Sequence, residues 1–253
     1  MNTLLSYDWG LTESGPTTHY WLVVPTTLTL SSMLITVMAQ AFSCMWGEIE
    51  LKPRYKNKPK SSSVGYYILN HSMASLLASF IIIYTKFHGT LYESNVFEMD
   101  ITQLTLYIVK VLLWVLIQVV IYDFFIYIFH RTCHINKTLY KYVHMQHHEN
   151  NSPRSVLDAI YGDALESTII AFFAVGQMMV FPMPVSSVVL FLFLISFFVQ
   201  INHSGRKVKI PLLYTYELHT AHHRYFKVNF AEHLMLWDFV FGTINLQHQG
   251  EGY

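Results

Sequence analysis

Charged side chains are scarce in this sequence. They make up 13% of its 253 residues, about half of the roughly one quarter that is typical of soluble domains. Hydrophobic residues reach 53%, and the mean hydropathy is +0.32. This composition excludes an intrinsically disordered chain and argues against a water-soluble two-domain enzyme. Sixteen basic residues balance sixteen acidic ones, so no global electric field favours nucleic acid, and we expect no nucleic-acid partner.

Cysteine is also rare, and a nucleotide-binding fingerprint is missing. Cys44 and Cys133 allow at most one disulfide, which argues against a disulfide-stapled secreted scaffold. The sequence has no G-x-G-x-x-G motif, so it shows no dinucleotide-binding signature. No basic region precedes the first apolar stretch, which makes a cleaved signal peptide improbable. Histidine, in contrast, is abundant: there are 14, and most of them are clustered.

Long apolar stretches predict membrane helices. A spanning helix needs about 20 mostly apolar residues, and residues 20–42, 64–85 and 104–129 meet this requirement. A fourth region, 167–201, carries no charge but is interrupted by Pro182 and Pro184. Prolines so close together break a helix, so we interpret this region as two limbs, 167–181 and 185–201. A shallow re-entrant hairpin and a single tilted crossing are both compatible with these lengths.

The flanking charges predict the orientation of the chain. Basic residues gather after the first span, at Lys52, Arg54, Lys56, Lys58 and Lys60. The positive-inside tendency places this connection in the cytosol, and the third span then returns the chain to the cytosol at His130. The expected fold is an all-α membrane protein with about four to five membrane helices or limbs. Residues 1–103 would form an amino-terminal membrane region, and residues 104–253 the catalytic region.

Eight histidines form three closely spaced clusters. They are His130 and His134 (H-x-x-x-H), His144, His147 and His148 (H-x-x-H-H), and His219, His222 and His223 (H-x-x-H-H). Positions i, i+3 and i+4 share one face of a helix, so each cluster could aim two or three imidazoles at one point. In a chain of this composition, a given three-histidine pattern arises by chance only roughly 0.04 times. Imidazole suits iron, zinc, copper and nickel, so the clusters predict a transition-metal site.

Eight imidazoles are too many for one ion. A mononuclear catalytic site typically uses three protein ligands and keeps a position open, so we expect two ions, each with room for a small ligand. A single crossing by residues 167–201 would place the third cluster on the side opposite the first two. A joint site therefore requires the hairpin, and it predicts a helical, cytosolic di-metal centre made of the three histidine boxes.

These motifs resemble the fatty-acid hydroxylase/sterol desaturase superfamily of membrane di-metal enzymes. The order of the three boxes matches, as does the long apolar gap before the third box, and the resemblance covers roughly residues 122–244. Smaller matching signatures are Tyr140-Lys-Tyr-Val-His144, Tyr161-Gly-Asp-Ala-Leu-Glu166, Asn202-His203-Ser204-Gly205, Asn229-Phe-Ala and Trp237-Asp238. They look most like those of methylsterol oxidases and cholesterol side-chain hydroxylases. The resemblance implies that His203 is a ninth metal ligand.

The resemblance also implies an activity: oxygen-dependent attack on an unactivated lipid C–H bond, with two iron ions as cofactors and O₂ as co-substrate. Zinc can replace iron in a purified form, since imidazole accepts both. A sterol or sterol precursor is the preferred substrate over a fatty-acyl chain. Reduction of dioxygen needs two electrons from outside, so we expect a separate reductase or a b-type cytochrome as partner. In a eukaryotic cell this resemblance places the chain in the endoplasmic reticulum membrane.

Other residues have several open roles. No catalytic residue beyond the metal ligands and no further cofactor-binding residue is predicted. Asp123, two helical turns before His130, could orient a ligand imidazole or reach water. Asp163, Glu166 and Asp238 could also orient ligands. His233 could support a ligand imidazole as well, but a solvated surface residue is the favoured expectation.

Three alternative functions remain open. A desaturase could use the same site, because removal of a first hydrogen is common to both reactions. A histidine-rich metal transporter would need ligands near the bilayer midplane, whereas the clusters follow the apolar stretches. A catalytically silent membrane scaffold is the third.

Overall fold

The structure is a computed structural model, and it describes residues 11–12, 15–49, 62–92, 94–149, 155–208, 210 and 213–246. The basic run from Lys52 to Lys60, on which the predicted orientation depends, lies outside the described residues. Within these described residues, four helices are long and apolar enough to cross a membrane: α1 Thr18–Trp46, α2 Ser62–His88, α3 Ile101–Ile135 and α6 Val185–His203. The predicted all-α membrane fold is confirmed.

Helix α3 is the longest element, and it carries the first histidine box. It begins with a capping box, in which the Asp100 side chain accepts hydrogen bonds from the backbone N–H groups of Thr102 and Gln103. This pairing satisfies backbone donors that a helix start leaves open. The helix continues without a break to Ile135. The prediction of a span at 104–129 was therefore too short, and the histidines of the first box lie within the helix rather than after it.

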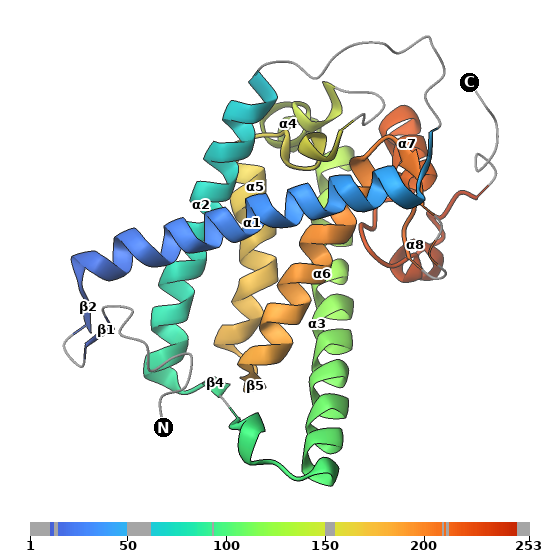
Figure 1. The fold of residues 1–253 in the computed structure, drawn as a ribbon. Coiled ribbons are helices and arrows are strands. Elements are labelled where there is room, and N and C mark those ends of the chain that lie inside the picture. Colours follow the sequence, from blue (N-terminus) through green and yellow to red (C-terminus); the bar gives the residue numbers. More distant parts are fainter. Residues whose placement is uncertain are drawn as a thin grey trace.

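The fourth apolar region forms a hairpin, as predicted. Helix α5, Ala164–Val175, is followed by the 3-10 turn η6, Gly176–Met179, and by strand β5, Met183–Pro184, before α6 begins. Strand β5 pairs in parallel with β4, Leu91–Tyr92. Pro184 occupies the residue before the first turn of α6. Both limbs return to the same end of the bundle, so the alternative of a single tilted crossing is excluded (Figure 1).

The hairpin packs between α2 and α3. Helix α5 lies against α2, and α6 lies against α3. One core cluster joins Val115 and Tyr122 of α3 to Phe191 and Ile195 of α6. The other side of α3 exposes a row of large apolar side chains, including Leu112, 55% exposed, and Leu116, 57% exposed. Such a surface is costly in water and suits contact with lipid.

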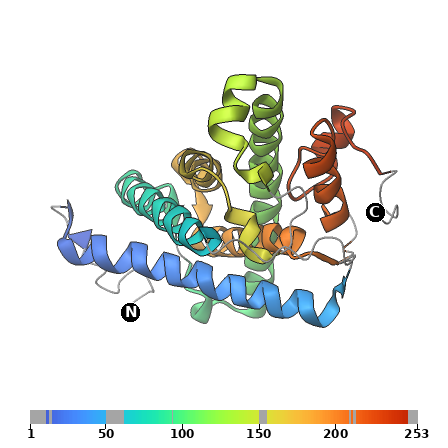
Figure 2. The same cartoon turned by 90° about the horizontal axis from the view of Figure 1, so that it is seen from above.

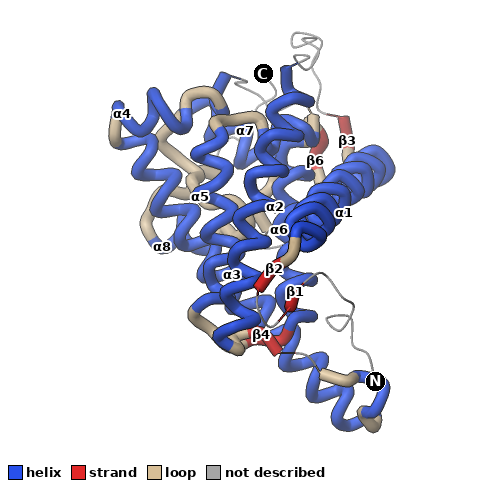
Figure 3. Tube along the Cα trace, turned by 90° about the vertical axis from the view of Figure 1, so that its left-hand side faces the viewer, coloured by secondary structure: helices blue, strands red, loops and turns tan. Residues whose placement is uncertain are grey.

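Helix α1 lies obliquely across this bundle, against α2 and α6 (Figures 1 and 2). In Figure 3 it is seen nearly end-on beside them. Polar groups connect it to α2: the Tyr20 hydroxyl donates to the carbonyl of Ser79, and the hydroxyl groups of Thr36 and Tyr67 are paired. Burying these groups without partners would be costly, so the hydrogen bonds fix how the two helices pack.

Short elements collect at the end of the bundle where α3 finishes. Asn136 is both the C-cap residue of α3 and the N-cap residue of α4. Its side chain accepts hydrogen bonds from two backbone N–H groups of α4. The elements of this end are α4 Lys137–Leu139, the π-helical turn η3 Tyr140–His144, the 3-10 turns η4 His147–Glu149 and η5 Val156–Ile160, α7 Tyr216–Tyr225 and α8 Leu236–Val240.

The remaining short elements are η2 Val96–Glu98 and the two-residue strands β1 Leu11–Thr12, β2 Gly15–Pro16, β3 Glu48–Ile49 and β6 Arg206–Lys207. Strand β3 pairs with β6 in antiparallel fashion. This pairing joins the end of α1 to the segment that follows α6. The amino-terminal helix is thereby tied to the same end of the molecule as the histidines.

Candidate metal centre

All eight clustered histidines and His203 lie at one end of the bundle, where they form two adjacent groups. In each group the possible ligand nitrogens lie within 4.8 Å of one another. The larger group contains five residues, His130, His134, His144, His148 and His222, and the smaller contains four, His147, His203, His219 and His223. The nine residues predicted to bind metal are therefore brought together, from α3, η3, η4, α6 and α7.

The two H-x-x-H-H boxes are divided between the groups, which the spacing did not predict. In the third box, His219 and His223 belong to the smaller group and His222 to the larger. Residues i and i+4 of a helix point in nearly the same direction, whereas i+4 and i+3 diverge by about 100°. The second box is divided in the same way, with His147 separated from His144 and His148. Each of these two boxes thus contributes to both groups, whereas His130 and His134 of the first box both belong to the larger group.

Hydrogen bonds on the outer side of the imidazoles set their tautomers. The Nδ1 atom of His130 lies 2.7 Å from the carbonyl oxygen of Phe230, that of His203 lies 2.7 Å from Val199, and that of His222 lies 2.8 Å from Val228. A carbonyl oxygen can only accept, so these Nδ1 atoms carry the hydrogen. The Nε2 lone pairs are then left free, so they are available to a metal ion.

The Nε2 atoms converge at spacings that suit ligands of one ion. The Nε2 atoms of His144 and His148 are 2.9 Å apart, and the same atoms of His203 and His219 are 2.7 Å apart. Two nitrogens that bind one ion at about 2.1 Å and at a right angle lie about 3.0 Å apart. The Nε2 atom of His130 is buried and has no hydrogen-bond partner. A bound cation would satisfy these lone pairs, so the residues fit a pair of metal ions.

Burial keeps the imidazoles neutral. Desolvation lowers the pKa of His144 to about 3. Burial, together with the neighbouring imidazoles, also holds the pKa of His222 and His223 well below the usual range. A neutral imidazole is the form that binds metal, so the fold prepares the ligands in the required protonation state.

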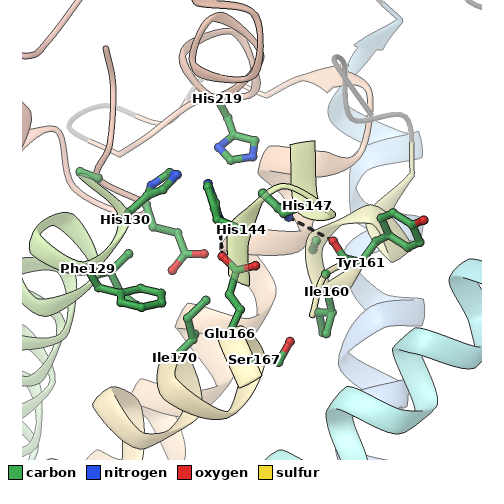
Figure 4. Close-up of a pocket in the computed structure, with 15 residues that line it drawn as sticks. Phe129, His130, His144, His147, Ile160, Tyr161, Glu166, Ser167, Ile170 and His219 are labelled. Atoms are coloured by element: carbon green, nitrogen blue, oxygen red, sulfur yellow. Dashed lines mark hydrogen bonds and ion pairs between the residues drawn. The ribbon is translucent and has the colours of Figure 1, made fainter. Parts of the chain in front are cut away.

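One ligand is held by a carboxylate. The Nδ1 atom of His144 lies 2.5 Å from Oε1 of Glu166, and both side chains are buried (Figure 4). Glu166 lies in the first turn of α5, where the cap Asp163 accepts from the backbone N–H of Leu165. The sequence-based suggestion that Glu166 orients a ligand agrees with this contact. For Asp163 the structure shows a helix cap instead.

Asp123 and Asp238 hold the loop that follows α7. Asp123 is completely buried, and its carboxylate accepts from the backbone N–H groups of Glu232, His233 and Leu234. Asp238 accepts in the same way from Phe230 and Ala231. Neither carboxylate has a ligand imidazole among its hydrogen-bond partners. Both carboxylates therefore act on the imidazoles indirectly. They hold the loop that supplies the Phe230 carbonyl, and this carbonyl orients His130.

The expectation of a solvated His233 is wrong. Its side chain is 3% exposed, and Nε2 donates to the carbonyl of Ile195. Burial alone would lower its pKa, but the nearby carboxylates of Asp123 and Glu232 outweigh burial and raise the pKa of His233. The Nδ1 atom lies 3.7 Å from Asp123 and 3.6 Å from Glu232. Local sequence gave no sign of this burial, because Asp123 lies 110 residues away.

A pocket lies beside the histidines. It encloses about 540 Å³, a volume that includes open solvent space. Helices α3 and α5 supply apolar walls through Ile126, Phe129 and Ile170, and η5 supplies Ile160 (Figure 4). Ligand imidazoles from both groups and two carboxylates complete the lining: His130, His144, His147, His219, Glu166 and Glu232. The pocket therefore joins an apolar wall to the metal centre. Glu232 was not singled out by any feature of the sequence.

These features define a membrane protein in which nine histidines that could hold metal ions gather beside a pocket with apolar walls. The profile of the fatty acid hydroxylase family matches residues 115–243, which include all nine histidines. The chain belongs to this family.

One curated relative is a Delta(7)-sterol-C5(6)-desaturase from Nicotiana tabacum. It is 30% identical to this chain over 131 residues, which cover 51% of this chain and 48% of the relative. The matched segment thus spans about half the length of the relative. No solved structure matches the chain.

Proposed function

We propose that this protein is a membrane-bound di-iron oxygenase that hydroxylates or oxidises a lipid C–H bond, with a sterol or sterol precursor preferred over a fatty-acyl chain. The observation that carries the proposal is the convergence of nine neutral imidazoles beside a pocket with apolar walls. Membership in the fatty acid hydroxylase family supports the reaction class. The name of the tobacco relative supports a sterol substrate.

The chain's own residues would hold the metals and orient the ligand rings. His130, His134, His144, His148 and His222 would bind one iron, and His147, His203, His219 and His223 the other. Bound iron supplies the reductive activation of dioxygen, which side chains alone do not provide. Carbonyl acceptors and Glu166 fix the imidazole rings. Ligands oriented in this way bind more tightly and reorganise less during reaction.

The pocket positions the substrate. Its apolar walls favour a hydrocarbon segment over water. Imidazoles of both histidine groups line the same pocket, so a carbon placed there lies beside the proposed metal centre. Holding the C–H bond in a fixed position next to the oxidant lowers the activation barrier, because substrate binding has already ordered the reacting groups. We further propose that this end of the bundle faces the cytosol of an endoplasmic reticulum membrane. There a reductase or a b-type cytochrome would deliver electrons.

Desaturation is a second candidate, and the name of the tobacco relative favours it specifically. Both reactions begin by removing one hydrogen atom, so the metal centre does not distinguish them. The products do, since an added oxygen atom indicates a hydroxylase and a new double bond indicates a desaturase. A metal transporter is less consistent with the structure, because the histidines lie in the last turns of α3 and α6 and in the short elements η3, η4 and α7, rather than halfway along the membrane helices.

The test is to purify the protein anaerobically, measure bound metal per chain, and assay sterol and fatty-acyl turnover with a reductase system. We expect two iron ions per chain and an oxidised sterol. H144A and H222A should lose metal and product together. Full metal occupancy with no turnover of either lipid class would contradict the proposed reaction. Metal-dependent uptake into vesicles, without oxygen consumption, would favour the transporter.

A further inference from the structure

Glu232 is held rigidly in the wall of the pocket. Its backbone N–H donates to Oδ1 of Asp123 at 3.1 Å, and its backbone carbonyl accepts from Nδ2 of Asn202 at 3.0 Å. These partners come from α3 and α6, so the residue is fixed from two sides. Its side chain is 18% exposed, and Glu232 lines the pocket together with His130 and His144. The exposed part of the side chain is therefore accessible from the pocket.

Only one oxygen of this carboxylate is occupied. Oε2 accepts a hydrogen bond of 3.0 Å from the Tyr122 hydroxyl, and Nδ1 of His233 lies 3.6 Å from the same oxygen. Among the described residues, we find no hydrogen-bond partner for Oε1. Because the side chain is partly exposed to the pocket, this oxygen is available to a donor that enters there. Glu232 belongs to neither histidine group, so a bound metal would not supply the missing partner.

The walls of the pocket restrict what could satisfy Oε1. Ile126, Phe129 and Ile170 are apolar and suit a hydrocarbon, but a hydrocarbon offers nothing to a carboxylate. A hydroxyl group can donate to a carboxylate and can accept from a protonated carboxyl group. An ammonium group could only donate, and two metal cations in the adjacent centre would repel it. A neutral hydroxyl group is the chemical partner that fits both the oxygen atom and its surroundings.

We propose that Glu232 is a specificity-determining residue whose Oε1 atom binds a hydroxyl group of the lipid substrate, so that the enzyme selects hydroxylated lipids over otherwise identical lipids that lack this donor. The proposal rests on the proposed function and refines its substrate class. Tyr122 acts as a positioning residue, because its hydroxyl group holds Oε2 and leaves Oε1 to the substrate.

The test compares two pairs of lipids that differ only in the donor. One pair is a Δ7 sterol with a free 3β-hydroxyl group and its 3-methyl ether, and the other is a long-chain 1-alkanol and its methyl ether. Binding is measured to the full-length protein loaded with zinc, which binds the same ligands without redox chemistry. For the wild type we expect the hydroxyl form of at least one pair to bind about 10- to 100-fold more tightly than its ether, as for one buried hydrogen bond to a charged group.

Variants then assign the effect to Glu232. E232L and E232M remove the acceptor and should reduce the hydroxyl-to-ether ratio to near one, while E232Q retains a carbonyl oxygen and should keep most of it. The matched control is E98Q, which makes the same charge change at an exposed residue of η2 and should keep the full ratio. Two zinc ions per chain in every variant would show that the site has folded. Turnover by the iron-loaded wild type should show the same preference as a KM difference.

Equal binding of the hydroxyl and ether forms of both pairs by the wild type would overturn the proposal. So would an unchanged ratio in a folded E232L or E232M. These results can be distinguished from a failure of the proposed function. Sterol turnover with no hydroxyl preference would contradict the role of Glu232 and leave the proposed reaction intact. A hydroxyl preference that depends on Glu232, without turnover of either lipid, would instead contradict the proposed reaction.

Discussion

The contact between Glu166 and His144 gives the sharpest prediction about the metal centre. Replacing Glu166 by alanine removes the acceptor that lies 2.5 Å from Nδ1 of His144. His144 would then lose the group that fixes both its tautomer and its ring orientation. A hydrogen bond to a charged group contributes about 1.5–3 kcal/mol. At about 1.4 kcal/mol for each factor of ten, E166A should weaken metal binding about 10- to 100-fold.

The loss should affect one ion more than the other, because His144 belongs to the five-histidine group. The assay is competition with a chelator of known affinity, followed by measurement of metal per chain. We expect E166A to retain one ion tightly and to release the second at lower chelator concentration than the wild type. E166Q keeps a neutral acceptor and should lose less. D163N is the matched control, since it alters a nearby carboxylate that caps α5. Identical chelator curves for E166A and the wild type would refute the reasoning.

Three further predictions follow from the same geometry. D123A should lower the free energy of unfolding by about 3–5 kcal/mol, because it leaves three backbone N–H groups buried without their acceptor; a thermal midpoint equal to that of the wild type would contradict this. Because the pKa of His233 is raised in the folded state, its contribution to stability should be complete below about pH 6.5 and should be lost as the pH rises through the raised value. H233N should flatten this part of the stability profile, and an unchanged profile would argue against the effect. H222A and H223A should each mainly deplete a different ion, because the two residues belong to different histidine groups. Loading two metals with different spectroscopic signatures in turn would identify the ion that each variant loses. Loss of the same ion in both variants would argue against the division into two groups.

The sequence by itself determined the membrane class, the three histidine boxes and the hairpin. Each of these depends on local properties. An uncharged run of about 20 residues has few stable locations other than a bilayer, two nearby prolines end a helix, and histidines at i, i+3 and i+4 recur too rarely by chance to be accidental. The requirement for one joint site then selected the hairpin over a single crossing.

The tertiary structure alone decided how the nine histidines are shared and which residues support them. Spacing places His222 and His223 on one helix, but the packing of the other histidine-bearing elements determines which histidine group each side chain joins. Asp123 meets its backbone partners across more than a hundred residues of chain, and Glu232 becomes part of the pocket through the same contact. Local patterns fix the direction of a side chain relative to its own helix, whereas long-range packing brings distant side chains together. For that reason, ligand types could be predicted from the sequence, and the division into five and four, the buried His233 and the free oxygen of Glu232 could not.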